Sequence, residues 1–118
     1  FRSARAVVFP SVWHEPAGLV SLEAAAHGRA LIASRVGGIP EYTSGKFATL
    51  VPPNDVPAFT AAMASLSRDP DRAAQMGRTG RQIATSDFTM DRFVRQLDGM
   101  YGSVTRDFGN PAPPSQFA

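Results

Sequence analysis

Three short apolar runs alternate with polar and helical segments in the first half of the chain. They cover residues 6–9 (AVVF), 30–33 (ALIA) and 48–51 (ATLV). Continuous apolar runs of this length are typical of strands buried on both faces of a parallel sheet. Between the first two runs, residues 19–27 (LVSLEAAAH) have helical periodicity, with Leu19, Leu22 and Ala26 on one apolar face. Gly28 is expected to end this helix.

Turn-forming and helix-capping residues after the apolar runs predict the remaining elements. A short helix is expected after Pro40, in the loop SRVGGIPEYTSG. Asn54 or Asp55 is expected to cap a helix that runs to about residue 68. Its inward-facing residues are predicted to be Phe59, Met63 and Leu66.

Two more helices are predicted toward the end of the chain. The first is capped by Asp69 and extends from about residue 70 to 84. The second begins at Asp87 or Thr89, and four of its apolar residues are expected to form core: Met90, Phe93, Leu97 and Met100. Tyr101 follows them on the same helix. Residues 106–118 (RDFGNPAPPSQFA) are Pro-rich and are expected to be irregular.

This order of elements predicts an α/β fold. Strands separated by helices pair in parallel through right-handed crossovers, which gives a partial Rossmann-like domain of about three parallel strands with flanking helices. We expect this domain to cover residues 1–105 and the tail to cover 106–118. Three strands make a small parallel sheet, so at least one edge is predicted to be open. The open edge predicts either a larger protein or self-association through that strand.

Composition narrows the function classes. The 118 residues carry a formal net charge of +2 and contain no run of like charges, which argues against a nucleic-acid footprint. There is no Cys, so disulfides, thiolate metal sites and cysteine nucleophiles are excluded. No apolar run is long enough to cross a bilayer, and a cytoplasmic location is expected. The chain begins at Phe1 rather than Met, from which we expect it to be a fragment.

The segment PSVWHEPAG carries the most informative chemistry. It leaves the carboxyl end of the first predicted strand, where open α/β sheets bind their ligands. It feeds a helix start whose free N–H groups, at Gly18, Leu19 and Val20, favour an anion such as phosphate. Glu15 and Glu23 are acceptors suited to hydroxyl groups. A nucleotide sugar has phosphates between two hydroxylated ends and fits this layout.

The stretch FPSVWHEPAGLVSLEAAAHGRALIASRVGGIPE resembles the signature of retaining glycosyltransferases of the GT-B fold, family 4 type. Glu15 and Glu23 match the two glutamates of the family's E-x7-E motif. SGKFATLVPPND resembles a later family motif, G-x-x-G-x-L-V-P-P-x-D. The resemblance covers about residues 1–101. This part of the chain is similar to the second half of the family's C-terminal, nucleotide-sugar-binding domain.

The resemblance implies a role for each matching residue. Glu15 would contact hydroxyls of the transferred sugar near the reacting carbon, and Glu23 would bind the ribose hydroxyls. Backbone N–H groups from Gly18 to Val20 would touch the sugar and the diphosphate. A loop at Gly37 and Gly38 would approach the donor or acceptor closely. The remaining candidate substrate-binding residues of the opening loop are His14 and Ala17.

The family transfers a sugar with retention and usually without a bound metal ion, so no cofactor is expected besides the nucleotide-sugar donor. Two positions depart from the pattern: Ala17 replaces the usual Phe, and Ala48 replaces a Gly. The Arg and Lys that neutralise the leaving diphosphate lie upstream in the family and cannot be placed here. The acceptor-binding N-terminal domain is the expected missing partner. The chain alone is therefore expected to be inactive, and the complete enzyme to be cytoplasmic or membrane-peripheral.

Several alternatives stay open. Glu15 could be a solvated loop acid and Glu23 a surface helix residue, although apolar neighbours predict partial burial of Glu23. Ser11 and Ser21 are interpreted as turn and helix-surface groups, because no base partner can be placed near them. The whole chain could instead be a nucleotide-sugar- or phosphate-binding module without catalysis. It could also be a fragment that associates with itself through its open strand edge.

Overall fold

The computed structural model describes residues 1–43 and 45–109, with side chains to residue 105. Contacts divide the chain into two units, Phe1–Ser86 and Asp87–Ala118. The first unit is built on a three-stranded parallel sheet in the order β1-β2-β3. The strands are β1 (Ala6–Phe9), β2 (Ala30–Ser34) and β3 (Ala48–Val51). This confirms the predicted α/β fold class and the three apolar runs.

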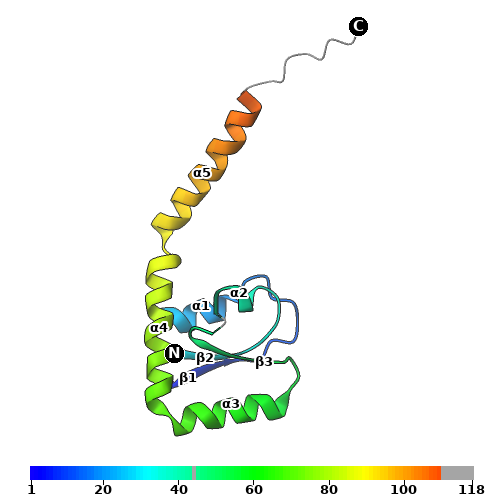
Figure 1. The fold of residues 1–118 in the computed structure, drawn as a ribbon, viewed down its shortest axis with the longest axis vertical. Helices are drawn as coiled ribbons and strands as arrows, with labels where there is room; N and C mark the ends of the chain where they lie inside the picture. Colours follow the sequence, from blue (N-terminus) through cyan, green and yellow to red (C-terminus); the bar gives the residue numbers. More distant parts are fainter. Residues whose placement is uncertain (44, 110–118) are drawn as a thin grey trace. The chain divides into compact units, whose positions relative to one another are not determined.

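Helices cover both faces of this sheet (Figure 1). Helices α1 (Leu19–Ala26) and α2 (Ile39–Thr43) lie on one face, and α3 (Val56–Arg68) lies on the other. Helix α4 (Pro70–Asp87) contributes Ala73 to the cluster on the α3 side and packs Ile83 and Ala84 against the cluster on the α1 side. It therefore joins the two apolar layers.

The core follows the alternation of the central strand. Ala30 and Ile32 of β2 face the α3 layer, whereas Leu31 and Ala33 face the α1 and α2 layer. All five residues of β2 are buried, because both of its edges are paired and both of its faces are covered. Cα partners such as Val8↔Ile32 and Ile32↔Thr49 fix the register and align the carboxyl ends of the strands.

Two of the predicted caps are formed in this unit. The Asp55 carboxylate accepts from the Ala58 N–H at 2.8 Å at the start of α3, and Asp69 accepts from the Arg72 N–H at 2.9 Å at the start of α4. Each satisfies an N–H group that has no partner inside its helix. Helix α4 extends three residues beyond its predicted end, to Asp87.

The buried faces of α1 and α3 differ from prediction. Helix α1 buries Ser21, Ala24 and Ala25, while Leu19 is 71% exposed and Ala26 is exposed. The expected apolar face and the expected surface position of Ser21 are both wrong. Small side chains let α1 lie close to the sheet. On α3, Phe59 and Leu66 are buried as predicted, but Met63 is 43% exposed and Ala62 takes its place in the core.

The second unit contains α5 (Met90–Gly109). Thr89 caps it, since its hydroxyl accepts from the Arg92 N–H at 3.2 Å. The helix includes the first four residues of the segment expected to be irregular; residues 110–118 of that segment lie outside the described part. Within this unit the core prediction is wrong for three side chains, which are exposed: Met90, Phe93 and Met100. Leu97 is half-buried. No described helix is long and apolar enough to cross a membrane.

Candidate functional site

The loop from Ser11 to Gly18 joins the carboxyl end of β1 to the start of α1 and holds Glu15 in a fixed place. The Ser11 hydroxyl donates to Glu15 Oε1 at 2.8 Å, and the Trp13 indole N–H donates to the same oxygen at 2.9 Å. Glu15 is half-buried, whereas Trp13 is 71% exposed. The Glu15 carboxylate is therefore ordered by its own loop, at the carboxyl ends of the strands, where open α/β sheets generally bind their ligands.

A second loop, after β2, lies against the backbone of Glu15. The Gly38 N–H donates to the Glu15 carbonyl at 2.9 Å. A Cβ at Gly37 would stand 1.9 Å from that carbonyl oxygen, and a Cβ at Gly38 would stand 2.3 Å from the Pro16 carbonyl oxygen. Gly37 also has φ +53°, which favours glycine. The structure thus brings Glu15, Gly37 and Gly38 together, with both glycines needed for the loops to meet.

The start of α1 has N–H groups that no side chain caps. Gly18 occupies the N-cap position with φ 61°, and its carbonyl accepts from the Ser21 N–H at 2.8 Å. The Tyr42 hydroxyl donates to the carbonyls of Ala17 and Gly18, the latter at 3.1 Å. In a trans peptide the following N–H points opposite to the carbonyl, so these bonds turn the N–H groups of Gly18 and Leu19 away from Tyr42.

Tyr42 is a residue of this site that the sequence did not single out. Burial raises the pKa of its phenol above the ordinary value, the nearby Ser21 hydroxyl acts in the opposite direction, and the Glu15 carboxylate raises the pKa further. The neutral phenol is therefore the stable form, and it is the form that can donate to the two carbonyls. Its position, directly after Glu41 in α2, gave no periodic signal.

Glu23 and His14 lie on the surface. Glu23 is exposed on α1, so the expected partial burial is wrong, and its backbone carbonyl accepts from the His27 N–H at 3.0 Å. His14 is exposed next to Glu15 in the loop, and Ala17 is exposed before Gly18. Val20 is half-buried on the first turn of α1. The structure places all of these residues around one helix start, with Glu15 ordered and Glu23 exposed to solvent.

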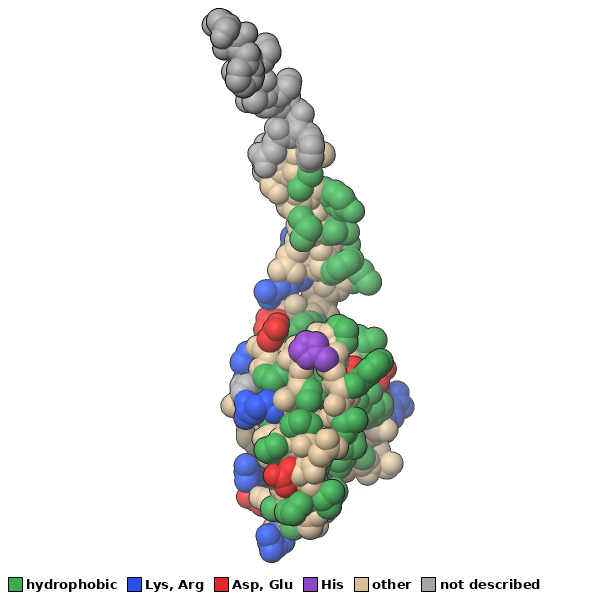
Figure 2. All heavy atoms as spheres, turned by 90° about the vertical axis from the view of Figure 1, so that its right-hand side faces the viewer, with side chains coloured by type: hydrophobic (Ala, Val, Ile, Leu, Met, Phe, Trp, Pro, Cys, Tyr) green, Lys and Arg blue, Asp and Glu red, His purple; other side chains and the backbone are tan. Residues whose placement is uncertain are grey.

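Exposed apolar side chains surround this edge of the sheet. Figure 2 looks toward the carboxyl ends of the strands and shows apolar side chains gathered there, with Lys and Arg toward the margins. The exposed large apolar residues of these loops and helix starts are Val12, Trp13, Leu19 and Val56. Among the described residues, no group of three or more His, Cys, Asp or Glu side chains could hold a metal ion.

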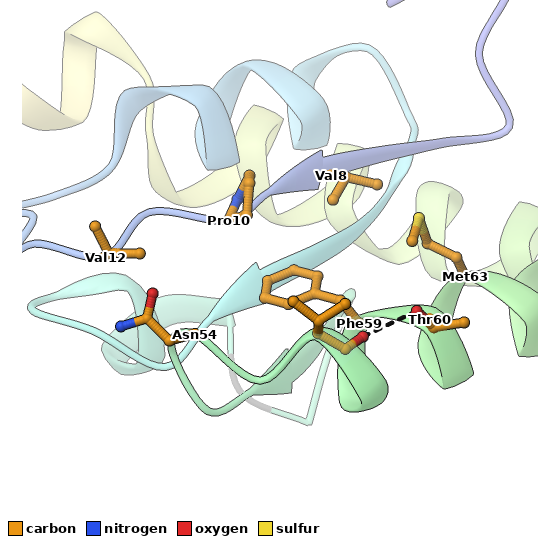
Figure 3. Close-up of a pocket in the computed structure, with 8 residues that line it drawn as sticks. Val8, Pro10, Val12, Asn54, Phe59, Thr60 and Met63 are labelled. Carbon is orange, nitrogen blue, oxygen red and sulfur yellow. Dashed lines mark hydrogen bonds between the residues drawn. The ribbon is translucent and has the colours of Figure 1, made fainter.

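An apolar pocket of about 280 Å³ lies between β1 and α3, on the face of the sheet that α1 and α2 do not cover (Figure 3). Val8, Pro10 and Val12 form one wall, and Phe59, Thr60 and Met63 of α3 form another. A neighbouring pocket shares Val8 and Met63 and continues the depression along β1. Both pockets thus lie along the open edge of the sheet, at β1. The walls of the first pocket are mostly apolar, so it offers few groups that could hydrogen-bond a ligand.

Comparison with known proteins assigns the family. A family model described as "Glycosyl transferases group 1" matches residues 1–69. The chain belongs to this glycosyltransferase family, whose GT-B architecture agrees with the parallel sheet described above.

Individual relatives agree with that assignment. Glycogen synthase of Mycobacterium tuberculosis is 38% identical over 111 residues, covering 93% of this chain and 27% of the relative. Alpha-maltose-1-phosphate synthase of Mycolicibacterium smegmatis is 40% identical over 110 residues, covering 87% of this chain and 28% of the relative. The solved structure of sucrose-phosphate synthase from Thermosynechococcus elongatus matches with a TM-score of 0.75 and 36% identity, covering 88% of this chain and 26% of that one. The chain thus spans about a quarter of the length of these relatives.

Proposed function

We propose that this chain is the donor-binding part of a retaining glycosyltransferase that transfers a hexosyl group from a nucleotide sugar to an acceptor. It corresponds to the second half of the C-terminal, nucleotide-sugar-binding domain. The observation that carries the proposal is the ordered Glu15 carboxylate beside the uncapped start of α1, with Glu23 exposed one turn further along that helix. Hydroxyl acceptors thus flank an anion-attracting helix start, as a sugar diphosphate requires.

Each residue of the site has a place in this function. Glu15 accepts hydrogen bonds from hydroxyls of the transferred sugar, near the reacting carbon. Glu23 accepts from the ribose hydroxyls. The N–H groups of Gly18, Leu19 and Val20 receive the diphosphate and the sugar. His14, Ala17, Gly37 and Gly38 form the rim around the donor, and the two glycines also hold the Glu15 backbone.

The reaction needs no metal ion or other cofactor in this proposal. Charge that develops on the leaving diphosphate is met by backbone N–H groups here and by an Arg and a Lys outside this chain. The carboxylate of Glu15 stays in place during the reaction because its loop already orders it. The configuration at the sugar carbon is retained, as the E-x7-E arrangement of Glu15 and Glu23 implies.

The acceptor site belongs to an N-terminal domain of a longer protein, which we call the complete enzyme. The chain covers about a quarter of the relatives' length, which supports this part of the proposal. The chain by itself binds donor weakly and does not catalyse transfer, since the basic pair and the acceptor domain are elsewhere. The complete enzyme acts in the cytoplasm or at the membrane surface.

Calorimetric titration of the 118-residue chain tests directly whether it binds the nucleotide-sugar donor. The probes are UDP, GDP and ADP and the glucose and mannose derivatives of these nucleotides. Binding that is weakened in Glu23→Ala, and kept in Asp98→Ala, supports the proposal. Asp98 is another exposed acid, on α5. If the folded complete enzyme binds none of these probes, the proposal is wrong.

A second candidate function is a binding module without catalysis. Ala17 and Ala48 favour it, because both depart from the family pattern. Of the two, Ala17 bears more directly on the site, because Ala48 pairs with Leu31 in the sheet and lies away from the loop that holds Glu15. A transfer assay of the complete enzyme separates the two functions. Tight donor binding with neither transfer nor donor hydrolysis would favour the module.

Self-association is a third candidate, and the open edge of β1 favours it. Val8 is 41% exposed on that edge beside the apolar pocket of Figure 3. A second copy could pair its own β1 there. Sedimentation across a range of concentrations measures the mass, and a chain that remains monomeric would rule out this role.

A further inference from the structure

Two donors of the opening loop converge on a single oxygen atom of Glu15. Ser11 Oγ lies 2.8 Å and Trp13 Nε1 lies 2.9 Å from Glu15 Oε1. Ser11 stands two residues after the end of β1 and is half-buried, so the sheet anchors it. Trp13 stands two residues before Glu15 in the same loop. The proposed function uses the ordered Glu15 carboxylate but gives neither donor a role of its own.

Because both donors bond Oε1, the two oxygens of the carboxylate have different roles. A carboxylate oxygen accepts along two lone-pair directions, and the two donors occupy both on Oε1. Oε2 is left as the acceptor for a ligand hydroxyl. The Gly38 N–H holds the backbone carbonyl of the same residue at 2.9 Å. Glu15 is therefore ordered through its side chain and its backbone before any ligand arrives, and a preorganised acceptor loses less entropy on binding.

We propose that Ser11 and Trp13 are positioning residues for Glu15, which fix Oε1 so that Oε2 faces a hydroxyl of the transferred sugar. This inference rests on the proposed function. A packing role does not explain Trp13, because its side chain is 71% exposed. The indole N–H bond to Glu15 is instead its polar contact within the loop.

The test compares Ser11→Ala and Trp13→Phe in the complete enzyme. Each change removes one donor and keeps most of the side-chain shape. We expect kcat to fall about tenfold in each, which is the size expected for one hydrogen bond to a charged group. The Kd for the matching nucleoside diphosphate should stay unchanged, because that probe has no transferred sugar. Ser11→Thr keeps the hydroxyl and should restore kcat, and Val12→Ala, an exposed change in the same loop, should have no effect.

A double-mutant cycle with Glu15→Ala shows whether the two donors act through Glu15. In that background, Ser11→Ala and Trp13→Phe should lower kcat no further. Losses that persist there, or equal losses in nucleoside diphosphate affinity, would overturn the positioning role and leave the function intact. If Glu15→Ala itself leaves transfer unchanged, the site assignment of the proposed function is wrong, and the positioning role falls with it.

Discussion

The backbone N–H of Gly38 donates to the backbone carbonyl of Glu15 at 2.9 Å, and this bond ties the loop after β2 to the loop after β1. The neighbouring residue makes the approach equally tight, since a Cβ at Gly37 would stand 1.9 Å from the same carbonyl oxygen. Two segments more than twenty residues apart in the sequence thus share one backbone contact at the candidate site.

Gly37→Ala should destabilise the fold and displace Glu15. The added Cβ meets backbone atoms that cannot rotate away, and φ +53° strains any other residue. The strain alone costs about 1–3 kcal/mol. We expect a loss of at least that size in urea unfolding, and a larger loss of transfer in the complete enzyme. Gly45→Ala is the control, because Gly45 has φ +67° but nothing within 4 Å of an added Cβ. Equal losses in both variants would show that the clash with Glu15 is unimportant.

Glu15→Gln and Glu23→Ala should have different kinetic effects in the complete enzyme. Glu15 faces the reacting sugar in the proposed function, so loss of its charge should lower kcat by about 10²-fold, as for other groups that act in the transition state. In the same proposal Glu23 binds ribose, so its removal should raise the donor Kd about tenfold with a smaller change in kcat. Steady-state kinetics and donor titration measure both quantities. Unchanged kinetics in both variants would contradict the site assignment.

The fold could be predicted where one sequence signal was sufficient. The runs at 6–9, 30–33 and 48–51 became strands because continuous apolar segments need cover on both faces. The caps at Asp55 and Asp69 formed because a side-chain oxygen reaches an N–H three residues on without help from the rest of the fold. Such local features do not depend on tertiary packing.

The buried face of α1 could not be predicted, because it depends on the distance between helix and sheet. A Cβ at Gly18 would stand 2.8 Å from Ile39 Cγ1, so the start of α1 lies close to α2. Small residues such as Ser21 and Ala25 fill that narrow space, and Leu19 turns outward. Hydropathy alone favours the opposite face. Met63 is exposed for a related reason, because it borders the pocket along the open edge of β1.

The candidate site was partly predictable. Glu15, Glu23 and the start of α1 were predicted as site residues from residue type, spacing and the family resemblance, and these assignments stay predictions. The partners of Glu15 were not, because the bonds from Ser11 and Trp13 depend on the loop conformation. Tyr42 reaches the loop from α2 across 24 or 25 residues, a contact that no local pattern indicates.

Tyr42→Phe should change the pH dependence of stability at alkaline pH. The pKa of the Tyr42 phenol is raised in the folded state, mainly by burial, so the native protein keeps its proton where the unfolded chain releases it. Above pH 10 the unfolded state therefore binds fewer protons, and the free energy of unfolding falls as pH rises. Below pH 10 this contribution is fully present. Urea unfolding between pH 8 and 11 should show a steeper decline in the wild type than in Tyr42→Phe. Parallel curves would refute the linkage, and Tyr101→Phe serves as the control because Tyr101 is exposed.

Asp55→Ala should weaken the start of α3. Its carboxylate accepts from the Ala58 N–H at 2.8 Å, and loss of such a cap costs about 1 kcal/mol. Helix α3 covers one face of the sheet, so the loss should appear in the global unfolding free energy measured by urea titration. Asp55→Asn keeps a capping oxygen and should restore most of the stability. The cap is unimportant if Asp55→Ala and Asp55→Asn unfold at the same urea concentration as the wild type.

Trp13 is the single tryptophan of the chain, so its emission reports on its bond to Glu15. Excitation moves electron density away from the pyrrole side of an indole ring, and an anion at the N–H stabilises that state. Removal of the charge in Glu15→Gln should therefore shift the emission to shorter wavelength. Glu23→Gln removes an exposed carboxylate from α1 and should leave the spectrum unchanged. Identical spectra for the wild type and Glu15→Gln would mean that the indole does not rest on the carboxylate in solution. A shift confined to Glu15→Gln would instead establish Trp13 as an optical probe for donor titrations, because a ligand at Oε2 alters the same charge.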